Sequence, residues 1–132
     1  MKVVLDTNIV VSAFLSPAGK PAHILSLVLS RKIGICFNTA ILAEYEEVLC
    51  RSKFAGRIHK SSIRRFFEIL HSVGSAVEAS ISKLDLPDET DRKFYDVATA
   101  AGAILVTGNK KHYPDEAHIC DPAEFLEKII VS

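Results

Sequence analysis

The chain opens with Lys-Val-Val-Leu-Asp-Thr-Asn at residues 2–8, and this run sets the architecture. Residues 2–5 are short, largely apolar and rich in β-branched side chains, which is typical of a strand buried on both faces. The run ends at Asp6, followed by Thr7 and Asn8. We therefore expect the Asp6 carboxylate at the carboxyl end of a buried strand, beside two short hydrogen-bonding side chains.

Strand-like and helix-like segments alternate along the rest of the chain. Short apolar runs predict strands at 35–37 and 103–107, with an irregular strand at 76–81. Apolar periodicity and capping residues predict helices over 21–34, 39–51, 61–74 and 90–102, and a short closing helix from 121. This alternation is typical of βα units, so the predicted fold is a three-layer α/β/α sandwich around a mainly parallel sheet.

Length and composition favour one domain spanning residues 1–132 with a substantial core, since 48% of the residues are apolar. Sixteen Lys and Arg balance sixteen Asp and Glu, so any contact with nucleic acid must depend on a local patch. Three cysteines without CxxC spacing argue against a disulfide framework and a zinc knuckle. With no run long enough to span a membrane and no leader-like start, we expect a cytoplasmic protein.

A second polar cluster follows the other clear strand, where Thr107 and Asn109 flank Gly108. The carboxyl ends of parallel strands share one edge of a sheet, and chemistry gathers at that edge. Asp6 and Thr107 are therefore expected to lie close together. The alternative for Asp6 is a purely structural role as the cap of a following helix.

Four further acids lie on predicted helices. Glu44 and Glu46 fall at opposite boundaries of one apolar stripe, and periodicity does not choose between them. Asp91 lies in a first helical turn, where the helix dipole favours an anion, whereas Asp96 flanks a core face and needs a partner. Carboxylates without His or Cys at ligand spacing suit Mg²⁺ or Mn²⁺ rather than zinc, and the natural use of such a site is hydrolysis.

Four stretches together resemble, in order, the motifs of PIN-domain ribonucleases, and the branch that includes the toxins of toxin–antitoxin pairs. They are residues 3–9, 41–49, 88–98 and 104–109, and the resemblance runs from Lys2 to about Leu126. The resemblance implies hydrolysis of single-stranded RNA by metal-activated water, leaving a 5′-phosphate and a 3′-hydroxyl. It also implies a small antitoxin partner and a homodimer.

The resemblance also implies the roles of single residues. Those implied are metal-holding carboxylates at Asp6, Glu44, Asp91 and Asp96, a fourth-motif residue at Asn109, and supporting groups at Thr7, Asn8 and Thr107. PIN domains often carry Asp in the fourth motif, so Asn109 is a departure that bears on whether a second metal binds.

Residues 51–67, the basic run, hold six of the sixteen cations and no acid: Arg51, Lys53, Arg57, Lys60, Arg64 and Arg65. Such a run can track the phosphates of RNA, and Lys110 and Lys111 follow Asn109 closely enough to join it. The alternative is a solvated helix–loop face.

Other classes of function fit the sequence less well. A haloacid-dehalogenase-type phosphatase also opens with a strand ending in Asp, but it needs a second acid where this chain has Asn8. A phosphate-accepting receiver domain needs an acidic pair near the first strand and an Asp that ends a middle strand. The remaining alternative keeps the PIN fold and loses catalysis, as a domain that binds RNA or a partner.

Overall fold

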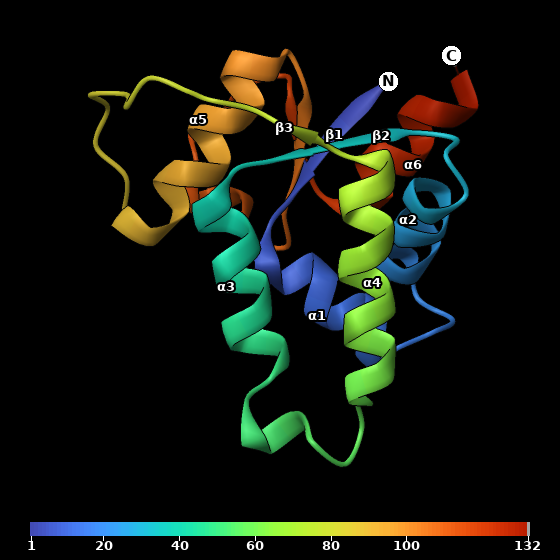
Figure 1. Cartoon of the computed structure of the whole chain (residues 1–132). Coiled ribbons are helices and arrows are strands. Elements are labelled where there is room, and N and C mark those ends of the chain that lie inside the picture. The colour runs from blue at the N-terminus through green and yellow to red at the C-terminus, as the bar shows by residue number, and fades with distance from the viewer. Residues whose placement is uncertain (132) are drawn as a thin grey trace.

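The computed structural model describes residues 1–131 and shows a five-stranded sheet between helices (Figure 1). The strands are β1 (Lys2–Leu5), β2 (Gly34–Phe37), β3 (Ser75–Ala76), β4 (Ile104–Val106) and β5 (Ile119–Cys120). Their order in the sheet is β3-β2-β1-β4-β5, and every neighbouring pair is parallel. The first strand is therefore central, as expected for a run buried on both faces.

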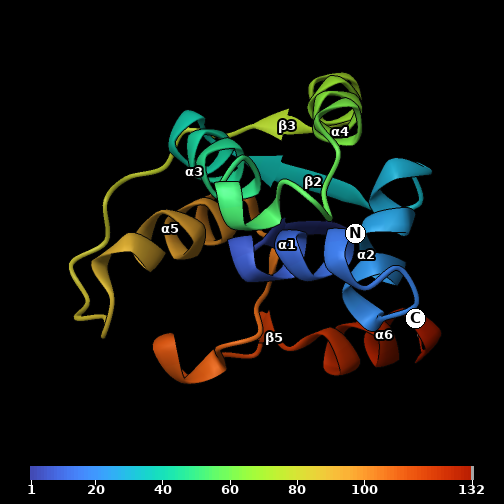
Figure 2. The same cartoon turned by 90° about the horizontal axis from the view of Figure 1, so that it is seen from below.

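Helices cover both faces of this sheet. The α-helices are α1 (Thr7–Leu15), α2 (Lys20–Leu29), α3 (Thr39–Leu49), α4 (Lys60–Val73), α5 (Arg92–Ala101) and α6 (Pro122–Val131). Short 3₁₀ turns occur at η1 (Ser52–Phe54), η2 (Glu89–Asp91) and η3 (Lys110–His112). Helix α5 crosses one face, whereas α2, α4 and α6 gather on the other (Figures 1 and 2). The predicted α/β/α sandwich with a parallel sheet is confirmed.

Three elements differ from the sequence predictions. Helix α1 has no predicted range, because its first two residues are polar and the rest, apart from Ser12, form a continuous apolar run without helical periodicity. Strand β5 is only two residues long and was also missed. The strand expected at 76–81 is reduced to β3, because the chain leaves the sheet once the Val77 N–H has bonded the Phe37 carbonyl at 2.8 Å.

Local signals placed most helix ends correctly. Asn38 caps α3 through the Ile41 N–H, and Asp121 and Glu124 form a reciprocal capping box at the start of α6. Gly102 ends α5 with a left-handed φ of 62°. The cap expected at Thr90 does not form: Asp88 caps the turn η2 by accepting from the Thr90 N–H at 2.9 Å, and α5 begins only at Arg92.

The carboxyl ends of β1 and β4 meet at one edge of the sheet. The Asp6 N–H donates to the Val106 carbonyl at 3.0 Å, and the Thr107 N–H donates to the Cys120 carbonyl at 2.9 Å. Helices α1 and α3 extend beyond this edge (Figure 1), and the buried Tyr45 of α3 donates its hydroxyl to the Leu5 carbonyl. Residues that follow the strands are therefore held close to residues of α3. None of the helices described within residues 1–131 is long and apolar enough to cross a membrane.

Candidate active site

Asp6 is the centre of a buried polar group. Its side chain is only 5% exposed, and its Oδ2 accepts hydrogen bonds from Thr107 Oγ1 at 2.8 Å and from the Tyr113 hydroxyl at 3.0 Å. Although Asp6 precedes α1, its side chain makes no capping hydrogen bond to that helix. The geometry therefore does not support a role for the Asp6 side chain as the cap of the following helix.

Asp91 lies beside Asp6 although the two are far apart in sequence. The Tyr113 hydroxyl donates to Asp6 Oδ2 at 3.0 Å and lies within reach of Asp91, whose negative charge also acts on it. On its other side, Asp91 Oδ2 lies 3.1 Å from His112 Nδ1. Asp91 is 9% exposed and makes no side-chain cap to α5. The two buried acids therefore form a pair held by Tyr113 and flanked by His112.

Burial governs the protonation of this pair. Burial raises the pKa of Asp6, and hydrogen bonds from Thr107 and Tyr113 offset part of that increase. The pKa of Asp91 is also raised, first by burial and then by the negative charge of Asp6. Burial beside these two acids raises the pKa of Tyr113 far above the usual value for a phenol. Tyr113 therefore stays protonated and remains a donor.

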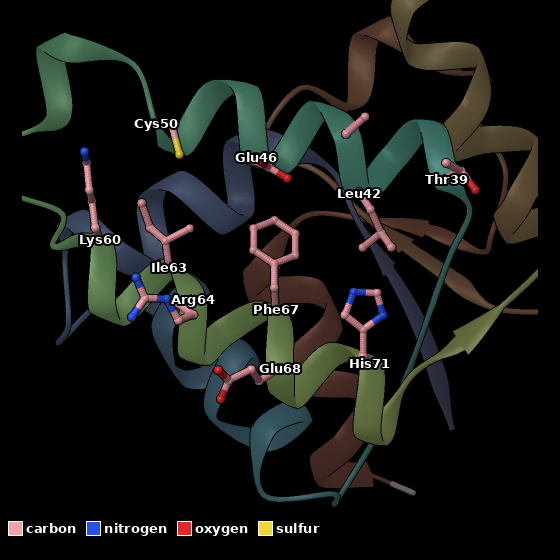
Figure 3. Close-up of a pocket in the computed structure, with 11 residues that line it drawn as sticks. Thr39, Leu42, Glu46, Cys50, Lys60, Ile63, Arg64, Phe67, Glu68 and His71 are labelled. Atoms are coloured by element: carbon pink, nitrogen blue, oxygen red, sulfur yellow. The ribbon is translucent and has the colours of Figure 1, made fainter.

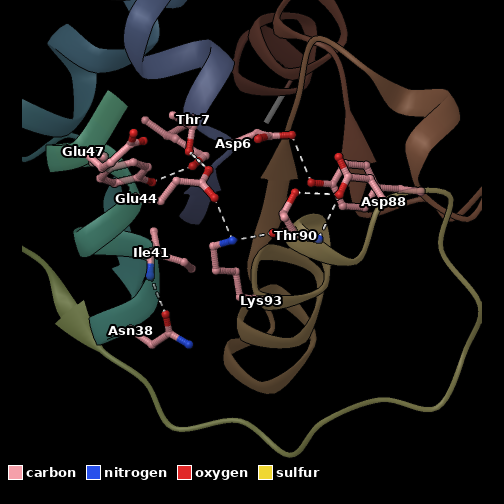
Figure 4. A network of polar contacts seen from close by, with 12 residues as sticks. Asp6, Thr7, Asn38, Ile41, Glu44, Glu47, Asp88, Thr90 and Lys93 are labelled. Carbon is pink, nitrogen blue, oxygen red and sulfur yellow. Dashed lines mark hydrogen bonds and ion pairs between the residues drawn. The ribbon is translucent and has the colours of Figure 1, made fainter. Parts of the chain in front are cut away.

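Glu44, on helix α3, is the third acid of the site, and each of its carboxylate oxygens contacts another side chain. Oε2 accepts a short hydrogen bond from the Thr7 hydroxyl, and Oε1 lies 2.7 Å from the Lys93 ammonium (Figure 4). Lys93 also donates to the backbone carbonyl of Thr90. The negative charge of Glu44 acts on Asp6, because it contributes to raising the pKa of that acid.

Asp96 is a buried acid within α5 that contacts the loop before that helix. Asp96 Oδ2 accepts from the Ser82 N–H at 3.2 Å, and Arg92 holds the same loop by donating to the Leu84 carbonyl at 2.7 Å. Asp96 therefore helps to hold the loop at Ser82, and its expected role at the metal site stays a prediction.

The residues expected to support the acids make different contacts. Thr107 Oγ1 donates to Asp6 and accepts the Asn109 N–H at 3.0 Å, while the Asn109 side chain is exposed. Asn8 Oδ1 accepts the Gly108 N–H at 3.0 Å and so links the segments that follow β1 and β4. Sequence reasoning missed Tyr113 and Lys93, for which the only available signal was closeness in sequence to Asn109 and Asp91.

The arrangement of acids fits a hard divalent ion. Within residues 1–131, no three or more His, Cys, Asp or Glu side chains stand together as a ready-made metal site. The expected four-acid cluster is therefore a pair, Asp6 and Asp91, plus a third acid whose oxygens Thr7 and Lys93 occupy. Mg²⁺ is commonly held by one or two carboxylates and keeps several waters. A repelling pair of buried carboxylates fits that donor chemistry.

The basic run surrounds the far end of the α3–α4 hairpin, and all six of its cations are exposed. Arg51 pairs with Glu47 at 2.8 Å on α3. Lys60 and Arg64 line a hollow between α3 and α4, whose centre is apolar because Phe67 and Leu42 face each other there (Figure 3). Arg65 lines a different hollow, against α1 and α2. These cations therefore encircle the hairpin instead of forming one stripe.

The two lysines near Asn109 differ in their surroundings. Lys110 pairs with Glu124 of α6 at 2.9 Å, which holds its ammonium group against the protein. Lys111 is exposed. Of the two residues, Lys111 is the one whose charge is presented to solvent beside the site.

The fold and the site together define a class of protein. Its members are α/β/α domains with a parallel sheet and a carboxylate site at the carboxyl edge of that sheet. A sequence model of the PIN domain matches residues 2–111. The uncharacterized protein MJ1680 of Methanocaldococcus jannaschii is 33% identical over 114 residues, which cover 83% of this chain and 72% of that protein. The chain belongs to the PIN-domain family.

Two solved structures share the fold. One is a chain of VapBC2 from Rickettsia felis bound to a DNA fragment from their promoter, with TM-score 0.59, 22% identity and coverage of 92% of this chain and 98% of that chain. The other is PAE2754 from Pyrobaculum aerophilum, with TM-score 0.62, 16% identity and coverage of 99% and 90%. The resemblance seen in the motifs is confirmed at the level of family and fold.

Proposed function

We propose that this protein is a metal-dependent ribonuclease that hydrolyses phosphodiester bonds of single-stranded RNA. The observation that carries the proposal is the buried pair Asp6 and Asp91, held within reach of one phenol at the carboxyl edge of the sheet. Placing two carboxylates in a buried site is costly without a cation to balance them. Family membership supports the same chemistry through the resemblance to PIN-domain ribonucleases.

In this proposal Asp6 and Asp91 hold Mg²⁺ or Mn²⁺. When bound, such an ion activates water and neutralises charge on a phosphoryl group. Thr107 and Tyr113 fix the orientation of the Asp6 carboxylate through their hydroxyl groups. Thr7 does the same for Glu44, and Asn8 fastens the loop after β4 to the start of α1. Hydrogen bonds within the chain therefore orient the Asp6 and Glu44 carboxylates.

The RNA is proposed to reach the site with help from exposed cations. Lys111 lies two residues before Tyr113, which donates to Asp6, and its side chain is exposed. The basic run on the α3–α4 hairpin extends the positive surface. Phosphate contacts of this kind give salt-sensitive affinity without selecting a base sequence.

The biological role that we propose is that of the toxin in a toxin–antitoxin pair. This part of the proposal depends on the resemblance of the motifs to that branch of the PIN family. It implies a small antitoxin protein that blocks the site, and a homodimer of this chain in the cytoplasm. Co-expression with the product of a neighbouring short reading frame should restore growth if expression of this chain arrests it. Growth arrest that is equal for the wild type and for Asp6→Asn would contradict the toxin role.

The test of the enzymatic activity is cleavage of single-stranded RNA by the purified protein in the presence of Mg²⁺ or Mn²⁺. We expect cleavage by the wild type, inhibition by a chelator, and loss of cleavage in Asp6→Asn. Product ends should be 5′-phosphate and 3′-hydroxyl. Tight RNA binding with no cleavage by the wild type would favour the non-catalytic alternative. Equal cleavage by both proteins would overturn the site.

A further inference from the structure

The ion pair between Lys93 and Glu44 lies inside the carboxylate site and has no role in the chemistry described so far. We propose that the site holds a single divalent ion, and that the Lys93 ammonium takes the place of a second cation beside Glu44. This inference rests on the proposed metal-dependent function and specifies how many ions that function uses.

The first support is the set of contacts around Glu44. Lys93 Nζ lies 2.7 Å from Oε1, and the Thr7 hydroxyl donates to Oε2 (Figure 4). The Glu44 and Lys93 side chains are only 26% and 21% exposed, so water screens the pair weakly. A metal ion that binds Glu44 would have to displace the ammonium from Oε1. Glu44 is therefore occupied in the resting site, in contrast to the mutually repelling pair Asp6 and Asp91.

The second support is the way in which Lys93 is held. Its ammonium also donates to the backbone carbonyl of Thr90, just ahead of Asp91. Lys93 is the second residue of α5, and Asp91 immediately precedes that helix. The same turn therefore presents an acid to the ion and a fixed positive charge to Glu44. An ammonium group supplies charge only, because it has no open coordination position for water or phosphate.

The third support is the formal charge of the site. Among the buried and half-buried groups, Asp6, Asp91 and Glu44 contribute three negative charges and Lys93 contributes one positive charge, which leaves −2. Asp88, whose charge also acts on Asp91, is exposed to solvent and accepts from Thr90. One divalent ion balances that charge, whereas two would leave an excess of +2. Asn109 adds no charge, and its side chain is exposed while its N–H bonds Thr107. His112, which lies against Asp91, adds no negative charge either. The donors present therefore match one ion.

The experiment counts bound Mn²⁺ by electron paramagnetic resonance of the free ion, and so needs no RNA cleavage. We expect one Mn²⁺ per wild-type chain. In Lys93→Met, which keeps the apolar stem without the charge, we expect a second Mn²⁺ whose affinity increases by about tenfold or more over any second binding to the wild type. The double variant Lys93→Met with Glu44→Gln should return to one ion. The control is Lys83→Met, which removes an exposed lysine and should leave one ion.

Each outcome separates this inference from the proposed function. Two ions of similar affinity in the wild type would overturn the inference, whatever the variants do. One ion in both the wild type and a folded Lys93→Met protein would also overturn it. No Mn²⁺ binding to the wild type, or binding that survives Asp6→Asn unchanged, would instead contradict the proposed metal site itself.

Discussion

The acidic edge of the sheet and the basic run on the α3–α4 hairpin differ in how far their charges are exposed to solvent. Asp6 and Asp91 come from distant parts of the sequence, lie almost fully buried and have raised pKa values. The cations of the basic run are neighbours in sequence, lie exposed and point to different sides of the hairpin. Exposed charge costs the fold little, whereas buried charge costs much more. The acidic edge is therefore the more informative of the two regions about function.

The largest difference between the two regions should appear when one charge is removed from each. We expect Asp91→Asn to lower RNA cleavage by more than about 100-fold, because it removes one of two proposed ion-holding carboxylates; loss of a mere supporting group already costs about 10- to 100-fold. Arg57→Gln in the basic run should change the rate only a few-fold. Single-turnover cleavage at saturating RNA measures both effects. Similar losses from the two substitutions would remove the contrast between the regions.

The hydroxyl of Tyr113 offers a test of how tightly the acidic edge is organised. Tyr113→Phe removes a donor to Asp6 Oδ2 but keeps the buried ring. We expect divalent-ion affinity to fall about 10- to 100-fold, because groups that orient metal ligands commonly contribute that much. Raising the Mn²⁺ concentration should restore most of the cleavage rate. A rate loss that extra Mn²⁺ does not relieve would mean that the hydroxyl acts in another way.

The contrast between the regions also explains what could be predicted from sequence. The site positions of Asp6 and Thr107 followed from strand ends, because parallel strands deliver their carboxyl ends to one edge. The basic run was visible because its residues are contiguous. Tyr113 and Lys93 gave no comparable signal, since their contacts depend on how a loop after β4 and the start of α5 fold back onto the edge.

Two features of the chain are hidden from local sequence patterns for the same physical reason. Asp91 and Asp96 both look suitable as ligands in the sequence, and the contact between Asp96 and the Ser82 N–H depends on how a separate loop folds against α5. Helix α1 escaped notice because burial on most sides removes the alternation of apolar and polar residues. Both depend on three-dimensional surroundings that local patterns do not describe.

The basic run should influence RNA affinity more than catalysis. In an Asp6→Asn background, where the RNA is expected to stay intact, Arg57→Gln combined with Arg64→Gln should weaken binding a few-fold at moderate salt. The slope of log affinity against log salt should fall by about one for each phosphate that the protein no longer neutralises. Lys20→Gln, at the start of α2, is the matched control. An unchanged salt slope would assign the run to the solvated face that the alternative describes.

The smallest expected effect is on stability, where removing a buried charge and removing an exposed charge should differ. The folded-state pKa of Asp6 is raised by burial, so its contribution to stability is fully present below the unfolded pKa and is lost as pH rises through the folded value. Asp6→Asn cannot ionise, yet its amide oxygen still accepts from Thr107. We therefore expect its Tm at pH 7, without divalent ions, to exceed the wild-type Tm by a few degrees, and the gap to close toward pH 4.

Neutralising the exposed Arg57 should leave Tm nearly unchanged, because that charge is already solvated. If the wild type is more stable than Asp6→Asn at pH 7 under these conditions, the ionised Asp6 carboxylate does not destabilise the fold, and the prediction is wrong.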